Sequence, residues 1–109
     1  MSTGFKNFGE FWPYYLGEHA KPTTRALHFA GTGAGLLLTA TALISGQYWL
    51  LLVALVCGYG PAWVGHFFVE KNRPATFRHP LWSLAADFRM FFFFITGRLS
   101  AELDRHGIR

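Results

Sequence analysis

The sequence predicts an all-α integral membrane protein, with an N-terminal amphipathic helix at the membrane interface and two to three transmembrane helices. Positions 26–69 contain no Asp, Glu, Lys or Arg, which leaves room for two spans of about 20 apolar residues each. Charged residues make up only 15% of the 109-residue chain, against about 25% in an average soluble domain. The length fits a single membrane domain over residues 1–109.

The first predicted element is an amphipathic helix over residues 4–19. Its aromatic residues recur at steps of three and four, which places them on one face together with His19: Phe5, Phe8, Trp12 and Tyr15. Trp and Tyr favour the headgroup boundary of a bilayer, so we expect this helix to lie in the interface. The helix ends near Pro22, and Thr23 or Thr24 can then cap the next helix.

Two transmembrane helices follow, over residues 25–45 and 48–69, joined by a tight turn at Gly46. Gly31 and Gly35 lie four residues apart in the first span, a spacing that lets a neighbouring helix approach closely. The sequence therefore predicts a closely packed transmembrane hairpin.

A third helix is predicted over residues 81–99, because Pro80 suits the first position of a helix. The sequence leaves open whether this helix spans the membrane or lies in the interface. Asp87 and Arg89 are two residues apart and do not face each other on a helix, so each needs its own partner on another element. Residues 100–109 are expected to form a short polar tail.

The basic residues predict the orientation of the hairpin. Six of them flank its open end, and the turn near Gln47 has none: Lys6, Lys21, Arg25, Lys71, Arg73 and Arg78. The positive-inside rule places this end, with the N-terminus, in the cytoplasm. The membrane would be the inner membrane of a bacterium or the endoplasmic reticulum of a eukaryote. The net charge of +4 then faces anionic lipid headgroups, and nucleic acid is not an expected partner.

Histidines are the candidate functional residues. Four of them fall at similar depth on the cytoplasmic side of the predicted topology: His19, His28, His66 and His79. Ionisable groups at membrane depth usually face the interior of a bundle, and imidazole binds Fe, Zn, Cu or Ni. Glu70 or Asp87 could accept a hydrogen bond from an outer imidazole nitrogen and so fix its tautomer. The alternative is that these histidines only form capping or interfacial hydrogen bonds.

Three runs of the sequence resemble the 2-hydroxy fatty acid dioxygenase family of fatty acid α-oxidation. They are FWPYYLGEH at 11–19, TRALHF at 24–29 and WVGHFFVEKNRPA at 63–75. The family includes a yeast membrane protein of phytosphingosine breakdown and shorter bacterial-type relatives, and the resemblance extends over residues 8–98. It implies an integral membrane enzyme that uses Fe(II) and O₂ to shorten a long-chain 2-hydroxy fatty acid by one carbon, with release of carbon dioxide.

The resemblance also implies roles for particular residues. The Fe(II) ligands would be His19, His28, His66 and His79. Glu70 and Asp87 would hydrogen-bond the ligands, and Arg25 or Arg78 would hold the substrate carboxylate. The Gly31–Gly35 face and the Phe-rich third helix would shape the acyl channel. One O₂ accepts the four electrons of this reaction, in keeping with a chain that lacks a nucleotide-binding fingerprint.

Two other functions remain open from the sequence. Paired histidines on neighbouring spans could bind haem in a small electron carrier. The chain could also be a non-catalytic membrane lipid-binding or assembly subunit whose histidines only form hydrogen bonds. Three helices barely enclose an acyl chain, so a homodimer is compatible with the sequence.

Overall fold

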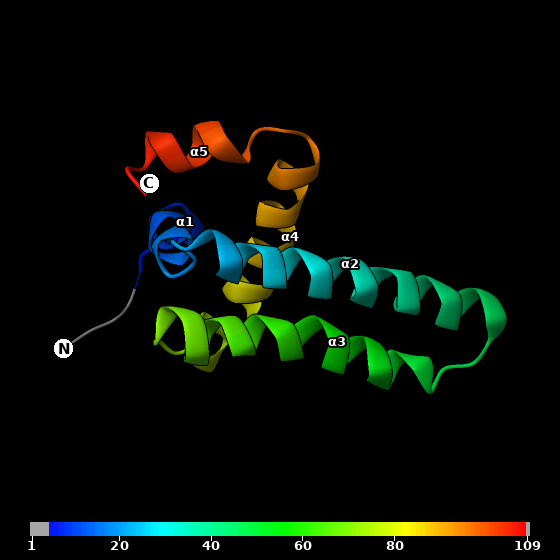
Figure 1. Cartoon of the computed structure of the whole chain (residues 1–109). Coiled ribbons are helices and arrows are strands. Elements are labelled where there is room, and N and C mark those ends of the chain that lie inside the picture. The colour runs from blue at the N-terminus through cyan, green and yellow to red at the C-terminus, as the bar shows by residue number, and fades with distance from the viewer. Residues whose placement is uncertain (1–4, 109) are drawn as a thin grey trace.

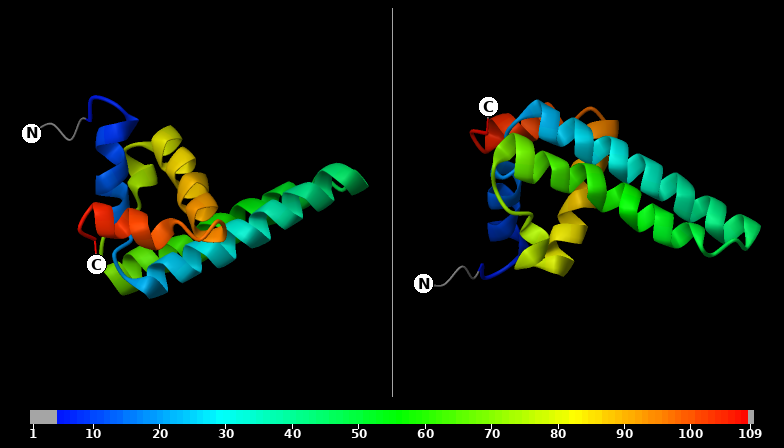
Figure 2. Two further views of the ribbon diagram at one scale, coloured as in Figure 1. Left: turned by 90° about the horizontal axis from the view of Figure 1, so that it is seen from above. Right: turned by 60° about the horizontal axis from the view of Figure 1, so that its bottom comes forward.

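The computed structural model describes residues 5–108, which form an all-α fold, as the sequence predicts. Helices α2 and α3 form a long hairpin that extends away from the rest of the molecule, α4 crosses it, and α1 and α5 lie at its open end (Figures 1 and 2). The elements are α1 (Phe8–Gly17), α2 (Pro22–Ser45), α3 (Leu50–Val64), the π-helical turn η1 (Gly65–Glu70), the 3₁₀ turn η2 (Ala75–Phe77), α4 (Pro80–Ile95) and α5 (Leu99–Arg105).

Helix α2 begins one turn earlier than predicted. Its N-cap is Lys21, and neither Thr23 nor Thr24 caps it. Pro22 occupies the first turn, where a missing backbone N–H costs nothing and a fixed φ favours the helix. The Glu70 carboxylate accepts a hydrogen bond from the Lys21 backbone N–H at 2.6 Å, which ties the start of α2 to the end of η1.

The close packing predicted for the hairpin is confirmed. A Cβ atom added at Gly31 would lie 2.6 Å from the carbonyl oxygen of Cys57, and one added at Gly35 would lie 3.2 Å from that of Ala54. At Gly31 the two backbones therefore approach more closely than a larger residue allows, and at Gly35 the contact is tight. Gly46 ends α2 with a φ of 76°, the left-handed conformation that glycine favours at a helix C-terminus.

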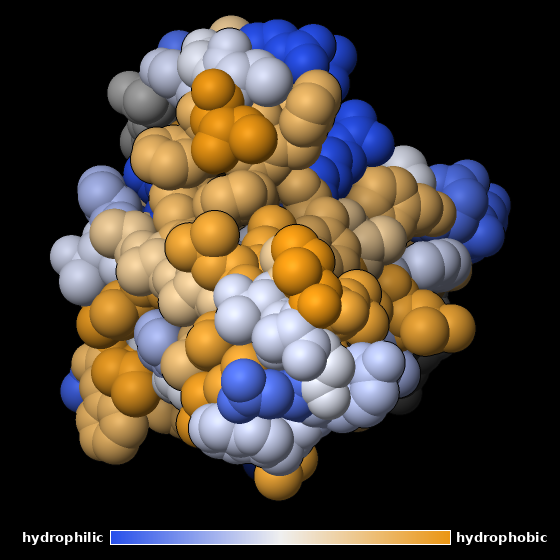
Figure 3. All heavy atoms as spheres, turned by 90° about the vertical axis from the view of Figure 1, so that its right-hand side faces the viewer, coloured by the Kyte–Doolittle hydropathy of each residue, from blue (hydrophilic) through white to orange (hydrophobic). Residues whose placement is uncertain are grey.

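Two helices among residues 5–108 are long and apolar enough to cross a membrane: Pro22–Ser45 and Leu50–Glu70. Only 17% and 22% of their most apolar windows are buried inside the protein. Apolar side chains accordingly cover much of the surface seen from the free end of the hairpin, around a more polar tip (Figure 3).

The third helix predicted over 81–99 ends earlier than expected, and a separate helix, α5, begins at Leu99. The shorter α4 ends at Ile95, and it is not one of the two candidate spans. Gly97 adopts a φ of 74° and reverses the chain into α5. The expected polar tail is therefore mostly helical, and Leu99 and Leu103 of α5 belong to the core.

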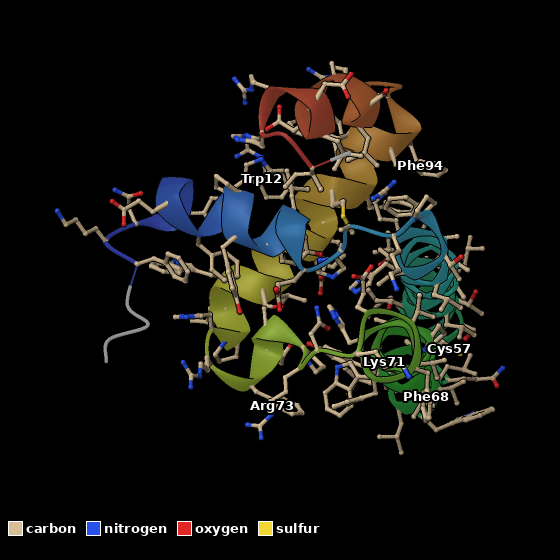
Figure 4. All side chains as sticks on the ribbon, turned by 60° about the vertical axis from the view of Figure 1, so that its left-hand side comes forward. Trp12, Cys57, Phe68, Lys71, Arg73 and Phe94 are labelled. Carbon is tan, nitrogen blue, oxygen red and sulfur yellow. The ribbon has the colours of Figure 1, made fainter. Side chains whose placement is uncertain are left out.

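The aromatic face of α1 packs inside the protein, although the sequence suggested that it would face the membrane interface. Trp12 and Tyr15 are only 3% and 1% exposed, because α4 and α5 provide surfaces that cover them. The Trp12 indole N–H donates to the Glu102 carboxylate of α5 at 2.6 Å, and Figure 4 shows Trp12 on the α5 side of α1. Arg89 lies 4.7 Å from the Trp12 ring centre, so it has the separate partner that the sequence predicted.

Candidate metal centre

Three buried histidines from three parts of the chain meet at the open end of the hairpin. His19 follows α1, His28 lies in the second turn of α2, and His66 lies in η1. The Nε2 atoms of His19 and His28 are 2.9 Å apart, and those of His28 and His66 are 3.4 Å apart. One nitrogen from each ring lies within 4.8 Å of the others, so the three could hold a metal ion.

The outer nitrogen of each ring faces an oxygen atom. His19 Nδ1 lies 2.7 Å from the Tyr15 carbonyl oxygen, and His28 Nδ1 lies 3.6 Å from a carboxylate oxygen of Asp87. His66 Nδ1 lies 2.7 Å from Oδ1 of Asn72. The Tyr15 and Asn72 oxygens accept hydrogen bonds from Nδ1 of His19 and His66, so the Nε2 atoms of these two rings present lone pairs to the shared centre, the arrangement typical of metal-binding histidines. The His28 ring turns its Nε2 atom to the same centre.

The backbone after His66 brings Asn72 beneath its ring. The helix widens to a π-helical turn over Gly65–Glu70, a feature that is frequent at functional sites. Lys71 then adopts a left-handed φ of 64°, and the Asn72 backbone N–H donates to the His66 carbonyl at 2.9 Å. The Asn72 side-chain NH₂ donates to the Glu18 carbonyl at 3.1 Å. This contact turns the amide oxygen toward His66, which makes His66 Nδ1 the donor.

Asp87 links the centre to α1. The Tyr15 hydroxyl donates a hydrogen bond to the carboxylate oxygen that faces His28. Burial raises the pKa of Asp87 to about 7, against the opposing effect of the Tyr15 hydrogen bond. Burial, followed by the neighbouring Asp87, raises the pKa of Tyr15 well above its ordinary value. The phenol therefore keeps its proton and remains a donor to Asp87.

Two of the nitrogen separations match those around a metal ion. A metal that binds two imidazole nitrogens at about 2.0–2.1 Å, with about 90–110° between the bonds, holds those nitrogens about 2.9–3.4 Å apart. The observed Nε2 separations are 2.9 and 3.4 Å. Burial, with His28 and His66 nearby, keeps the pKa of His19 well below its ordinary value. His19 is thus neutral at pH 7, as a metal ligand must be.

Two residues predicted at the site lie elsewhere. His79 precedes Pro80, and its ring contacts Phe5 and Phe11 and stacks on Trp82 at 5.6 Å, so it is not part of the three-histidine cluster. The Glu70 carboxylate binds the backbone at the start of α2. The role that the sequence offered to Glu70, as the partner of His66, is filled by Asn72.

The two candidate arginines do not line the cavity between the histidines. Arg25 donates hydrogen bonds to the carbonyl oxygens of His19 and Ala20 at 2.9 and 2.8 Å, and so holds the loop that carries His19. Arg78 lines a pocket of about 470 Å³ with Glu18 and Arg73.

Sequence reasoning missed Tyr15 and Asn72 as partners of the site. Tyr15 was assigned to the aromatic face of its helix, although it lies one turn before His19. Asn72 lies within the run WVGHFFVEKNRPA that carries the family resemblance. Its place in that run was the available signal that Asn72 belongs to the site. Only the π-helical turn shows that its side chain contacts His66.

The histidines enclose a cavity of about 10 Å³, about the space of one water molecule. The cavity shares Tyr59 and Asp87 with an apolar groove between α2, α3 and α4, and it shares Pro74 and Ala75 with the polar pocket of Arg78. The centre thus lies between an apolar surface and a charged one. A porphyrin does not fit in a cavity of this size, which argues against a haem site.

Comparison with known proteins gives one match. A family model described as "2-hydroxy-palmitic acid dioxygenase Mpo1-like" matches residues 5–99, a range that includes the three clustered histidines as well as Tyr15, Asn72 and Asp87. No curated protein matches the chain. No solved structure matches it either. By the extent of the family match, the chain belongs to the Mpo1-like family of 2-hydroxy-palmitic acid dioxygenases.

Proposed function

We propose that this chain is an Fe(II)-dependent membrane dioxygenase that converts a long-chain 2-hydroxy fatty acid into the fatty acid one carbon shorter. The observation that carries the proposal is the convergence of three buried histidine rings. Their Nε2 atoms come together, and the outer nitrogen of each ring, Nδ1, faces an oxygen atom. A set of three histidines that leaves coordination positions open suits an iron centre that must also bind substrate and O₂.

The reaction balances without a further reductant. A 2-hydroxy acid and one O₂ give the shortened acid, one carbon dioxide and one water. The bond between the carboxyl carbon and C2 breaks, C2 becomes the new carboxyl carbon, and O₂ takes up the four electrons released. Iron would supply the redox chemistry that couples O₂ to this cleavage.

In this proposal the chain's own residues hold and orient the ligands. His19, His28 and His66 would hold the iron. Tyr15 and Asp87 orient the His28 ring, and Asn72 orients the His66 ring. Arg25 positions His19 through the loop carbonyls. Arg78, in the polar pocket beside the cavity, is the candidate partner of the substrate carboxylate.

We further propose that the α2–α3 hairpin spans the bilayer, with its open end and the N-terminus on the cytoplasmic side. His28 lies about 9 Å along α2 from Pro22, at 1.5 Å per residue. In a hairpin that spans the bilayer, the centre would then lie near the headgroup boundary. An amphiphilic acid in the bilayer carries its carboxylate at this depth. The exposed apolar side chains of the hairpin, such as Leu37 and Ile44, would face lipid.

The test combines metal analysis and turnover of the purified protein in detergent. We expect about one non-haem iron per chain after expression with iron, together with conversion of 2-hydroxyhexadecanoic acid to pentadecanoic acid and equal amounts of O₂ consumed and carbon dioxide released. His28→Ala and His66→Ala should each lose both iron and turnover. His79→Ala is the matched control, because it removes a histidine outside the cluster, and it should keep the iron.

Full turnover in His28→Ala and His66→Ala would refute the assignment. A folded protein that binds no metal and is unaffected by a chelator would instead support the lipid-binding subunit. Replacement of iron by zinc separates metal binding from redox chemistry, because zinc should occupy the site and support no O₂ consumption.

A further inference from the structure

We infer that the apolar groove between α2, α3 and α4 binds the alkyl chain of the 2-hydroxy acid and sets the chain length that the site accepts. This inference rests on the proposed function. The groove lies outside the metal centre, because none of the three histidines lines it. The proposed reaction alone therefore does not identify the groove.

The groove has the size and lining of a site for an alkyl chain. Its volume is about 330 Å³, within the usual range for small-molecule pockets. It is lined by small residues of the hairpin, namely Gly35, Ala54 and Gly58, and by larger apolar residues such as Leu55 and Phe88. Asp87 is the only charged residue in the lining. A polar ligand would find few partners along the groove.

The direction of the groove follows from the residues it shares with the metal centre. Tyr59 and Asp87 line both the groove and the histidine cavity, so the two spaces adjoin. Thr39 and Leu51 mark the far end, about 16 Å along α2 from His28 and about 12 Å along α3 from Tyr59 at 1.5 Å per residue. The groove therefore leads from the centre toward the turn of the hairpin, within the two apolar helices.

The opposite side of the centre has the contrary character. The pocket that shares Pro74 and Ala75 with the histidine cavity is lined by Glu18, Arg73 and Arg78, and Figure 4 shows Arg73 on the outside of the molecule, away from the hairpin. A molecule with a charged head and an apolar tail fits this asymmetry in one orientation only, with the tail in the groove. Leu55 and Phe88 are 57% and 45% exposed, so the groove opens sideways and a chain can enter from the bilayer.

Gly58 offers a sharp test. A Cβ atom added there meets no atom within 4 Å, although Gly58 lines the groove. A leucine at this position should fill the groove without disturbing the packing of the hairpin. Gly60 is the matched control, because its Cβ is equally unobstructed and it does not line the groove.

The experiment uses the iron-loaded full chain in lipid nanodiscs and 2-hydroxyhexadecanoic acid with a diazirine at the terminal carbon. After photolysis, we expect labelled peptides around Thr39 and Leu51. Gly58→Leu should reduce labelling and long-chain turnover at least about tenfold, with unchanged iron content. Gly60→Leu should behave as the wild type. Leu51→Trp provides a second variant that narrows only the far end, and it should shift the preferred substrate to shorter acids.

The results separate the two proposals. Labels outside the groove, or long-chain labelling and turnover in Gly58→Leu and Leu51→Trp equal to those of the wild type, would overturn the groove assignment while the dioxygenase function stands. The opposite result is also possible to observe: labels lie in the groove and disappear in Gly58→Leu, but the protein consumes no O₂ with any 2-hydroxy acid. This result would support the groove as the alkyl-chain site and overturn the proposed function.

Discussion

Replacement of Gly31 by alanine should destabilise the hairpin and weaken the metal centre together. The added Cβ would lie 2.6 Å from the Cys57 carbonyl oxygen and 3.1 Å from that of Gly58. Both oxygens belong to the α3 backbone, which cannot move aside as a flexible side chain can.

The expected loss follows from two opposing contributions. Overpacking against backbone atoms costs about 1–3 kcal/mol. The higher helix propensity of alanine offsets at most about 1 kcal/mol of this. We therefore expect Gly31→Ala to lower the free energy of unfolding by about 1–2 kcal/mol. Because Gly31 lies one turn after His28, separation of the two helices also moves His28 away from His66 and should reduce iron affinity.

The assay is equilibrium unfolding of the metal-free protein in mixed micelles, followed by circular dichroism, with iron affinity measured separately. Gly60→Ala is the control on the same hairpin, because its Cβ meets no atom within 4 Å, and it should be as stable as the wild type or slightly more so. Equal free energies of unfolding for Gly31→Ala and Gly60→Ala would refute the argument from close helix packing.

Three further predictions concern the surroundings of the centre. Thr24 is buried and its hydroxyl has no hydrogen-bond partner among the described residues. Thr24→Val should therefore raise the free energy of unfolding by about 1 kcal/mol. A lower melting temperature would contradict this prediction. Asn72→Ala removes the hydrogen-bond acceptor of His66 Nδ1. It should weaken iron binding about 10–100-fold, and iron should still bind at saturating concentration. Unchanged iron affinity would show that the Asn72 amide does not orient the His66 ring. His19 has a folded-state pKa well below its ordinary value, so below about pH 6.5 the unfolded chain binds more protons than the native one. The metal-free protein should lose stability as the pH falls through this range, and His19→Asn should show a flatter pH dependence of the melting temperature; equal slopes would refute the attribution to His19.

The course of the hairpin was readable from the sequence because it depends on local signals. The uncharged stretch at 26–69 gives the two long helices, Gly46 gives the turn, and Gly31 and Gly35 give the close contact. A hairpin necessarily brings residues near its two ends together, so His28 and His66 were predictable neighbours.

The choice between His19 and His79 depended on tertiary structure. Each lies next to a helix boundary on the same side of the hairpin, and sequence position does not reveal which way such a side chain points. His19 is drawn to the centre by the Tyr15 carbonyl and the His28 ring, whereas His79 packs on aromatic rings, including that of Trp82. The burial of the α1 aromatic face was equally unpredictable, because it required α5 in place of a polar tail.

The partners of the histidines show the same division. The sequence alone determined that His28 and His66 lie at the same end of the hairpin, because the length of the two apolar stretches and the position of the turn fix where each helix ends. Only the tertiary structure decided which oxygens face them. Asn72 contacts His66 because the chain forms a π-helical turn and Lys71 adopts a left-handed conformation. Tyr15 of α1 donates a hydrogen bond to Asp87 of α4. These contacts depend on side-chain direction and on packing between distant segments, which local sequence periodicity does not determine.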